Sequence, residues 1–177
     1  MEPVEIRPET PADIEAIHRI EAAAFKNEAL AKLVNQLRAE GALLLSHVAV
    51  CNDQIVGHAA YSLLTITDGD RVEHCPALGP IGVDPPYQGR GIGATLVRAG
   101  LGAMPDLGYG LLFLVGSPRY YPRFGFQPAQ PLGFSSDYVE PGGPHEHFMV
   151  AVLDERAPRS LRGHTRFHPA FAEAEAG

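Results

Sequence analysis

The sequence predicts a single domain of mixed α/β class, in which a mostly antiparallel central sheet is flanked by helices. Segments rich in Val, Ile, Leu and Thr, separated by short turn sequences, predict the strands. Amphipathic helical segments precede and follow the central strands. A length of 177 residues with 45% hydrophobic content is typical of one globular domain. Together these features favour helices that pack against one sheet.

The first half of the chain is expected to form a strand, a helical pair and three antiparallel strands. Residues 4–7 alternate apolar and charged side chains, as a short strand does. Residues 10–13, Thr-Pro-Ala-Asp, supply a capping residue, a first-turn proline and an acidic residue. They predict the start of a helical pair that covers about residues 11–40, with a break near Asn27. The three strands that follow are predicted at 43–50, 54–66 and 72–83.

The second half is expected to alternate helices and strands. Residues 89–104 carry apolar side chains at helical spacing and stop before a proline. Residues 111–115 are all apolar, which predicts a fully buried strand. A short helix follows through Tyr121, and further strands are predicted near 124–128 and at 148–153.

Two boundaries complete this outline. The Gly, Pro and Ser content of residues 131–146 predicts a loop. We assign residues 1–154 to the domain and residues 155–177 to a partly ordered C-terminal extension.

Composition and charge exclude several classes of function. A formal net charge of −7 argues against a broad nucleic-acid surface, which needs a concentrated basic face. No apolar run approaches the ~20 residues of a membrane-spanning helix, so no membrane partner is expected. The acidic N-terminus lacks the features of a signal peptide, so we expect a cytoplasmic protein. Cys51 and Cys75 are too few for a disulfide framework and are predicted to be buried thiols.

Three glycines within five residues carry the strongest chemical signal. Gly89, Gly91 and Gly93 follow a predicted strand and open an amphipathic helix, so a ligand can approach the backbone N–H groups there. Phosphate binding is one interpretation, and a tight turn that needs glycine for packing is the other. The segment has no Gly-Lys-Ser/Thr ending, which argues against a P-loop, and its spacing differs from that of a dinucleotide-binding fold.

The glycine segment extends into a longer resemblance. Residues 81–94 resemble the acyl-CoA-binding signature of the GNAT N-acetyltransferases, Gln/Arg-x-x-Gly-x-Gly/Ala. Residues 121–126, Tyr-Pro-Arg-Phe-Gly-Phe, resemble the Tyr-x-x-x-Gly-Phe element of the same family. The resemblance covers about residues 4–153. The sequence of residues 116–126 is most similar to that of a bacterial subgroup of predicted N-acetyltransferases with unassigned substrates.

The resemblance implies acetyl-CoA as co-substrate and a role for each matching residue. The backbone around Gly82, at Ile81 and Val83, would pair with the pantetheine arm as one strand pairs with another. Pro80 cannot donate a sheet hydrogen bond and fits a splay in this strand, where the family holds the thioester. The residues expected to present N–H groups to the pyrophosphate are Gln88, Gly89, Arg90, Gly91, Ile92, Gly93 and Ala94.

Tyr121 resembles the tyrosine that protonates the departing CoA thiolate in the family. The alternative is a core tyrosine whose hydroxyl bonds to a backbone group. Relatives often carry an asparagine ahead of this tyrosine, and none is obvious here. Ser117 either replaces that asparagine in cofactor binding or only caps the short helix.

A base must also remove a proton from the acceptor amine, because an alkylamine is almost wholly protonated at neutral pH. The candidates by residue chemistry are His58 and Glu73, with His74 and Glu28 also considered. Each of them also fits a surface or hydrogen-bonded polar residue without a catalytic role. The segment 145–147, His-Glu-His, is predicted to be solvated, and no metal site is expected.

The predicted function is therefore the transfer of an acetyl group from acetyl-CoA to a primary amine by direct attack in a ternary complex. One alternative is a non-catalytic acyl-CoA sensor or interaction module on the same fold, and another is a binder of a different nucleotide. The acceptor is a small molecule or a protein amine. The helical pair and the 131–146 loop are expected to shape its pocket, and a homodimer is one option for the assembly.

Overall fold

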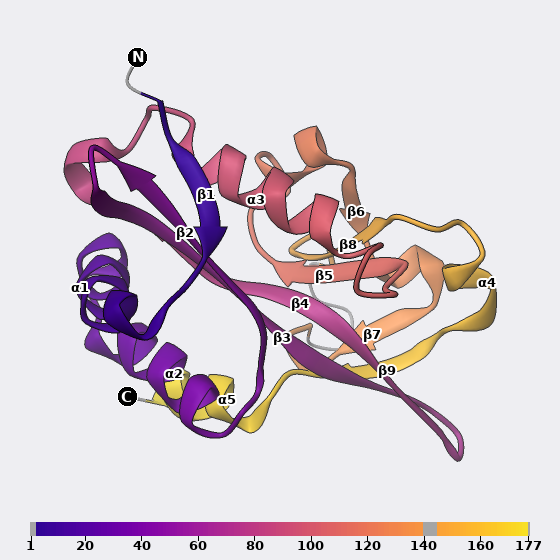
Figure 1. Ribbon diagram of the computed structural model, residues 1–177. Helices are drawn as coiled ribbons and strands as arrows, with labels where there is room; N and C mark the ends of the chain where they lie inside the picture. The colour runs from indigo at the N-terminus through magenta and orange to yellow at the C-terminus, as the bar shows by residue number, and fades with distance from the viewer. Residues whose placement is uncertain (1–2, 140–144, 177) are drawn as a thin grey trace. The chain divides into compact units, whose positions relative to one another are not determined.

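The computed structural model describes residues 3–139 and 145–176 and divides them into two compact units (Figure 1). The first unit holds the described residues up to Ser62, together with Gly79–Gly100 and the residues from Pro169 onward. The second unit holds Leu63–Leu78 and the described residues from Leu101 to His168. Two long strands, β3 (Gln54–Asp68) and β4 (Arg71–Val83), contribute residues to both units.

The sheet of the first unit is antiparallel where its first three strands pair. Strand β1 (Glu5–Pro8) pairs with β2 (Leu43–Cys51), and β2 pairs with β3. The strand order continues from β3 to β4. All four strands lie where the sequence predicts them, and their ends differ from the prediction by one or two residues.

Two helices follow β1, as predicted. A 3₁₀ turn, η1 (Pro11–Asp13), leads into α1 (Ile14–Phe25), and α2 is Glu28–Ala39. The break lies at Asn27, whose side chain accepts a hydrogen bond of 2.8 Å from the backbone N–H of Ala29 and so caps α2.

Helices cover both faces of this sheet. Ile17 of α1 and Val34 of α2 pack on Val48 and Ala60, and all four are fully buried. On the opposite face α3 (Ile92–Ala103) lies so close that a Cβ added at Gly57 would be 3.1 Å from Ile92 and Leu96. Glycine at this position therefore lets α3 approach β3, and the first unit has a helix–sheet–helix arrangement.

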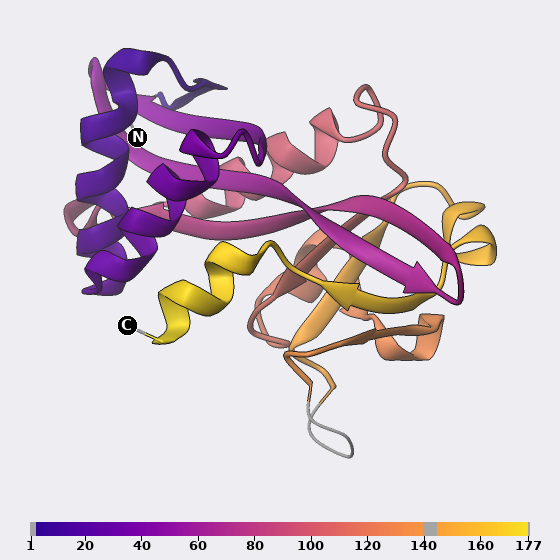
Figure 2. The same cartoon turned by 90° about the horizontal axis from the view of Figure 1, so that it is seen from below.

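The predicted C-terminal extension contains three regular elements that the sequence analysis leaves unassigned. They are α4 (Ala157–Ser160), β9 (Gly163–Arg166) and α5 (Pro169–Ala176). Helix α5 lies beside α2 in the first unit, where Ala170 is buried with Leu33 and Leu37 (Figure 2). The boundary between residues 154 and 155 stays a prediction.

The second unit combines parallel and antiparallel pairing. Strand β5 (Leu111–Val115) runs parallel to β4, where Ala77 lies opposite Phe113. It pairs in antiparallel register with β8 (Phe148–Val152), which pairs in turn with β6 (Phe126–Pro128). The first four residues of β5 are buried as predicted, whereas Val115 is 43% exposed.

The loop predicted at residues 131–146 is wrong in one part. Residues 134–136 form strand β7 (Phe134–Ser136), which pairs in parallel with β9, and β9 pairs with β3. The partner strand comes from the C-terminal segment, so local sequence carries no signal for this pairing. Residues 140–144 of the predicted loop lie outside the described residues.

Aromatic side chains form the centre of the second unit. Phe113 packs edge-on against Phe134, with ring centroids 5.0 Å apart, and stacks with Phe148 at 5.7 Å. All three side chains are buried together with aliphatic residues of β3, β4 and β8.

No helix in the described part of the chain has the length and apolar character to cross a bilayer.

Candidate functional site

The glycine turn between β4 and α3 has the backbone conformation that only glycine adopts readily. Gly89 has a φ of 74° and Gly91 a φ of 83°. No atom lies within 4 Å of a Cβ placed on either residue. Glycine is therefore required here by the backbone conformation, and the space beside both residues is open. The helix starts at Ile92, three residues later than predicted, because these two glycines belong to the turn.

Side chains on both sides of the turn hold its shape. Gln88 Nε2 donates to the carbonyl of Val83 at 3.0 Å, and Arg90 Nη2 donates to the carbonyl of Pro86 at 2.9 Å. The Arg90 guanidinium also lies 5.1 Å from the centre of the Tyr87 ring. These contacts stabilise a preformed turn.

The backbone amides at the start of α3 are able to bind an anion. Thr95 N–H donates to the carbonyl of Gly91 at 3.0 Å, which is a bond of the first helical turn. The N–H groups ahead of Thr95 therefore have no carbonyl within the helix to pair with. Such groups at a helix N-terminus bind phosphate oxygens through hydrogen bonds and the helix dipole.

The strand that precedes the turn is packed tightly from one side. A Cβ added at Gly82 would lie 2.9 Å from Glu21 Oε2 and 3.1 Å from the Cβ of Ala24, both on α1. Gly82 therefore makes room for a carboxyl group next to the segment that contains Ile81 and Val83. The Gly79–Pro80 peptide bond is cis. The splay expected at Pro80 stays a prediction.

His58 lies inside the first unit and is fully buried. Its Nδ1 is 2.6 Å from Glu21 Oε1, and its Nε2 is 2.9 Å from Ser46 Oγ. Ser46 Oγ also donates to Glu9, which is paired with Arg38 at 2.7 Å. Sequence reasoning selected His58 but missed its partners. One signal was present, since Glu21 is a charged residue on an otherwise apolar helix face.

Tyr121 belongs to the second unit and starts the 3₁₀ helix η3 (Tyr121–Phe124). The short helix was predicted to end at this residue, so the prediction is wrong by one turn. Ser117 Oγ accepts a 3.3 Å hydrogen bond from the backbone N–H of Arg119, and its carbonyl accepts from the N–H of Tyr121. Ser117 thus caps the segment that carries Tyr121.

The Tyr121 ring is half-buried among aromatic side chains. It packs edge-on against Tyr120 and Phe126, and a Cβ at Gly116 would collide with it. Burial, with a smaller contribution from Tyr120, raises the pKa of Tyr121. Within the residues that the structure describes, its hydroxyl makes no hydrogen bond, so the core-tyrosine alternative lacks its backbone partner here. The phenol is protonated at neutral pH, as a general acid must be.

The other base candidates are at the surface. Glu73 pairs with Arg71 at 3.0 Å, and both side chains are about half exposed. His74 Nδ1 lies 3.4 Å from Thr65 Oγ1. Glu28 Oε2 lies 3.1 Å from His18 Nε2 on the first-unit helices. These contacts fit the polar surface role that the sequence analysis kept open for each of them.

Neither cysteine lies at the surface. Cys51 and Cys75 are buried thiols, as predicted. Burial, with the charge of Glu73 adding to it, raises the pKa of Cys75 to about 11, so its thiolate is scarce at neutral pH. His147 Nδ1 lies 3.1 Å from the carbonyl oxygen of Gly116. No three His, Cys, Asp or Glu residues in the described ranges are grouped to hold a metal ion.

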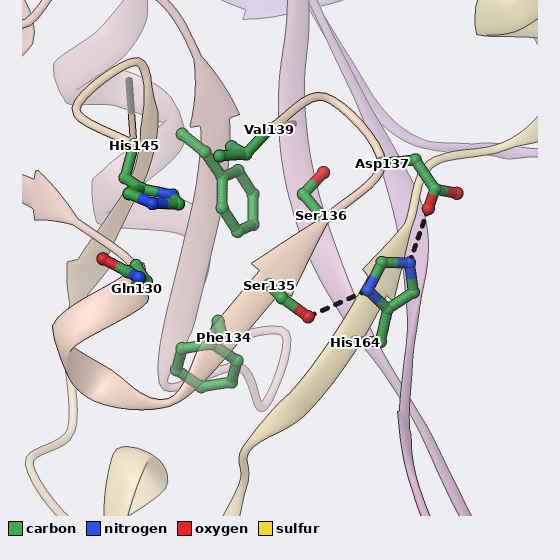
Figure 3. A pocket seen from close by; sticks show the side chains of 9 residues that line it. Gln130, Phe134, Ser135, Ser136, Asp137, Val139, His145 and His164 are labelled. Carbon is green, nitrogen blue, oxygen red and sulfur yellow. Dashed lines mark hydrogen bonds and ion pairs between the residues drawn. The ribbon is translucent and has the colours of Figure 1, made fainter. Parts of the chain in front are cut away.

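The second unit contains a cavity of about 450 Å³ (Figure 3). Phe134, Val139 and Phe148 supply apolar lining. At its rim, His164 Nδ1 lies 2.8 Å from Ser135 Oγ and His164 Nε2 lies 2.7 Å from Asp137 Oδ1. We call Ser135, His164 and Asp137 the rim trio. The cavity offers apolar surface beside one carboxylate and falls partly within the segment expected to shape the acceptor pocket.

Comparison with known proteins shows the family of the chain. A family model described as acetyltransferase (GNAT) domain matches residues 5–129. The uncharacterized N-acetyltransferase YhbS of Escherichia coli strain K12 is 31% identical over 94% of this chain and 97% of its own length. The uncharacterized N-acetyltransferase YjhQ of the same strain is 31% identical over 88% of this chain and 87% of its own length.

Two crystal structures share both fold and sequence with the chain. The GNAT family N-acetyltransferase YhbS from Escherichia coli, solved in complex with CoA, has a TM-score of 0.88 and 29% identity, covering 97% of this chain and 93% of its own. A GNAT family acetyltransferase from Brucella melitensis, in complex with acetyl-CoA, has a TM-score of 0.77 and 32% identity, covering 97% and 99%. These matches confirm the predicted mixed α/β fold class. The chain therefore belongs to the GNAT family of acetyl-CoA-dependent N-acetyltransferases.

Proposed function

We propose that this protein transfers the acetyl group of acetyl-CoA to a primary amine by direct attack within a ternary complex. The open glycine turn at the N-terminus of α3 is the observation that carries the proposal. Its free amides suit the pyrophosphate of CoA. The crystal structures of two relatives, named as complexes with CoA and acetyl-CoA, support the same ligand.

The cofactor roles follow from the backbone. Residues 88–94 would present their N–H groups to the pyrophosphate, and the backbone of Ile81 and Val83 would pair with the pantetheine amides. Ser117 would contribute by capping the segment that carries Tyr121. A backbone N–H near Pro80 would stabilise the oxyanion that forms on the thioester carbonyl.

The transfer moves one acetyl group and releases one proton. A base first takes the proton that the ammonium form of the amine loses, and the neutral nitrogen then attacks the thioester carbonyl carbon. As the carbon–sulfur bond breaks, Tyr121 gives its phenol proton to the departing thiolate, and the resulting phenolate regains a proton from the nitrogen, which loses its second proton on becoming an amide. The raised pKa of Tyr121, which burial causes, keeps the phenol protonated and supports its role as the acid. For the role of the base His58 and Glu73 remain the candidates, His58 through its buried partners and Glu73 from the surface.

The cavity of the second unit is our candidate for the body of the acceptor. Its apolar lining fits an alkyl or aromatic group, and Asp137 supplies negative charge for a cationic group of the acceptor other than the amine that reacts. An acceptor with an apolar body and such a cationic group fits both features. The helical pair, the second part of the expected acceptor pocket, stays a prediction.

The decisive experiment compares Tyr121→Phe with Tyr120→Phe while CoA release is measured over a panel of primary amines. Loss of the general acid should lower kcat about 100-fold, with the acetyl-CoA KM changed by less than about threefold. Tyr120 is the matched control because it is an adjacent tyrosine in the same aromatic cluster. Equal kcat values for the two variants would remove the role of Tyr121.

CoA release and a thermal-shift measurement together test the two alternatives. A thermal shift with acetyl-CoA but no CoA release with any amine would support a non-catalytic acyl-CoA sensor. A thermal shift with ATP or NAD alone would overturn the CoA assignment.

Location and assembly are also proposals. We propose a cytoplasmic protein, which fractionation of the source cells tests. We keep the homodimer as the assembly to examine by light scattering with and without acetyl-CoA.

A further inference from the structure

Four side chains form a continuous hydrogen-bonded row through the interior of the first unit. Glu21 Oε1 lies 2.6 Å from His58 Nδ1, and His58 Nε2 lies 2.9 Å from Ser46 Oγ. Ser46 Oγ then contacts Glu9 Oε2. We call Glu21, His58, Ser46 and Glu9 the buried row. It joins α1, β3 and β2 to the segment after β1.

The position of each proton in the buried row follows from donor accounting. Glu9 is ionised, because Arg38 donates two hydrogen bonds to it at 2.7 and 2.9 Å. Ser46 must therefore donate its single hydroxyl proton to Glu9, and its oxygen can only accept from His58. His58 thus carries a proton on Nε2. One further proton lies between His58 Nδ1 and Glu21 Oε1, as a neutral pair or as an ion pair.

The inner end of the buried row has an open acceptor. Glu21 is fully buried, and its Oε2 has no hydrogen-bond partner among the described residues. This oxygen faces Gly82, where an added Cβ would be only 2.9 Å away. A buried carboxyl oxygen without a hydrogen-bond donor costs free energy. A donor that binds beside Gly82, such as an amine or a water molecule, would remove that cost.

The two ends of the buried row differ in their affinity for a proton. Burial raises the pKa of Glu21. Burial would also raise the pKa of Glu9, but hydrogen bonds from Arg38 and Ser46 outweigh it and lower that pKa. The Glu9 side chain is 17% exposed and the Arg38 side chain 20%, so this outer end reaches solvent. The inner end retains a proton, and the outer end releases one.

We propose that the buried row is a proton relay that carries the proton lost by the acceptor amine from the Gly82 segment to solvent at Glu9. The inference rests on the proposed function. It deepens that function by assigning the base to Glu21 and His58 together and by naming Ser46 and Glu9 as the path outward. Glu73 has no part in it.

Each step of the relay moves one proton and leaves the chain unchanged. The proton from the amine, directly or through one water, arrives at Glu21 Oε2, and the proton on Oε1 passes to His58 Nδ1. His58 gives its Nε2 proton to Ser46 Oγ, which gives its own to Glu9. Glu9 loses that proton to solvent, and the starting arrangement returns when the Glu21 carboxyl group, the His58 ring and the Ser46 hydroxyl group each turn to their first orientation.

The charged groups around the buried row are few. Arg38 faces Glu9 from α2, and beyond it Asn35 links Arg38 to His18, which pairs with Glu28 at the surface. His47 is buried on β2, and burial together with nearby His58 lowers its pKa. On the β4 side Glu21 faces Gly82, which carries no charge. Arg38 is therefore the permanent cation beside the row.

Ser46→Ala breaks the relay at its centre without removing an ionisable group. We expect kcat/KM for the amine to fall about 30-fold at neutral pH, within the range for proton-transfer groups. The loss should shrink to about twofold or less as the pH rises to the pKa of the amine, because a neutral amine needs no deprotonation before attack. Ser46→Thr keeps the hydroxyl and should restore the wild-type profile.

Ser62→Ala is the matched control. Ser62 is a buried serine on β3 of the same unit, and its hydroxyl has no partner within the described ranges. Its pH profile should match that of the wild type. Thermal unfolding and acetyl-CoA binding of all variants, measured alongside, show that each one is folded.

The outcomes separate the relay from the function on which it rests. A loss in Ser46→Ala that is equal at every pH, or a profile like that of Ser62→Ala, overturns the relay while wild-type turnover upholds acetyl transfer. Absence of amine-dependent CoA release by the wild type overturns the proposed function, and the relay with it. A pH-dependent loss that Ser46→Thr reverses supports both.

Discussion

Two hydrogen-bonded groups in this protein each join a carboxyl group, a histidine and a serine, one in the interior and the other at the surface. The buried row of the first unit connects Glu21, His58 and Ser46 with the Glu21 and His58 side chains fully shielded from solvent. The rim trio of the second unit connects an aspartate, a histidine and a serine beside an open cavity, and its Asp137 side chain is 66% exposed. Distances between the paired atoms are similar in the two groups.

The two groups differ in the free-energy cost to the carboxyl group when its partner is lost. Water replaces the partner of an exposed carboxylate at little cost, so an isolated surface pair contributes little to stability. A buried carboxyl group has no such replacement, and its protonation is tied to that of the histidine. Similar geometry therefore predicts a proton-transfer unit in the interior and a polar binding surface at the rim.

Glu21→Ala is the strongest test of this contrast. It leaves His58 buried without its partner and should lower the free energy of unfolding by roughly 3–5 kcal/mol. Asp137→Ala, the matched change in the rim trio, should cost less than about 1 kcal/mol. Chemical denaturation of both variants measures the difference. Equal losses would show that burial does not distinguish the two groups.

The pH dependence of unfolding compares two buried carboxyl groups of the first unit, Asp13 and Glu21. Hydrogen bonding to Arg7 lowers the pKa of buried Asp13 to about 2. A lowered folded-state pKa gives stability that is present above the ordinary value of about 4 and is lost as the pH falls toward the folded value. Asp13→Asn should therefore cost roughly 1.5–3 kcal/mol at neutral pH, and this cost should shrink on acidification.

Glu21 should show the opposite slope in the same titration. Because burial raises its folded-state pKa, its contribution is present below the ordinary value and is lost as the pH rises. The stability of the wild type relative to Glu21→Gln should therefore fall with increasing pH. Denaturation of both variants across the pH range tests the two signs, and parallel slopes would contradict the assignment.

Gly82→Ala tests the contact at the inner end of the buried row. The new methyl group would meet Glu21 Oε2, which the bond to His58 holds in place, so we expect a cost of about 1–3 kcal/mol. The same change should cost less in a Glu21→Ala background. A double-mutant cycle on unfolding free energies measures this coupling, and additive losses would argue against the contact.

Asp137→Asn should have the smallest effect and tests the acceptor proposal. Loss of one exposed charge at the cavity rim should raise the KM for a cationic amine by about fivefold or less, with the acetyl-CoA KM unchanged. Glu155→Gln removes an exposed carboxylate of the second unit that does not line the cavity, and it is the control. An identical amine KM for both variants would show that Asp137 does not contribute to acceptor binding at the cavity.

Much of the fold could be predicted because its signals are local. The break at Asn27, the apolar strand at residues 111–115 and the strands 43–50 and 54–66 all follow from side-chain periodicity and turn residues. Strand β7 and the C-terminal elements could not be predicted in this way. Three-residue β7 exists because β9 lies beside it, and that pairing joins segments about 30 residues apart.

Some residues of the candidate site could likewise be predicted from the sequence, and others could not. Amino-acid type marked the glycine turn and His58, because positive φ at glycine and the chemistry of imidazole are properties of single residues. Tyr121 was marked by its resemblance to the Tyr-x-x-x-Gly-Phe element of the family. Glu21, Ser46 and Glu9 were missed as a group, since they come from separate elements and only folding brings them to His58.

The sequence by itself thus determined the family, the glycine turn and most of the strands and helices. These depend on backbone preferences and periodicity that neighbouring residues set. Only the tertiary structure decided that His58 has buried partners at both ring nitrogens and that Gly82 leaves room for Glu21. Those features depend on burial and on distances between side chains that are far apart in the chain, and burial decides how strongly a charge interacts.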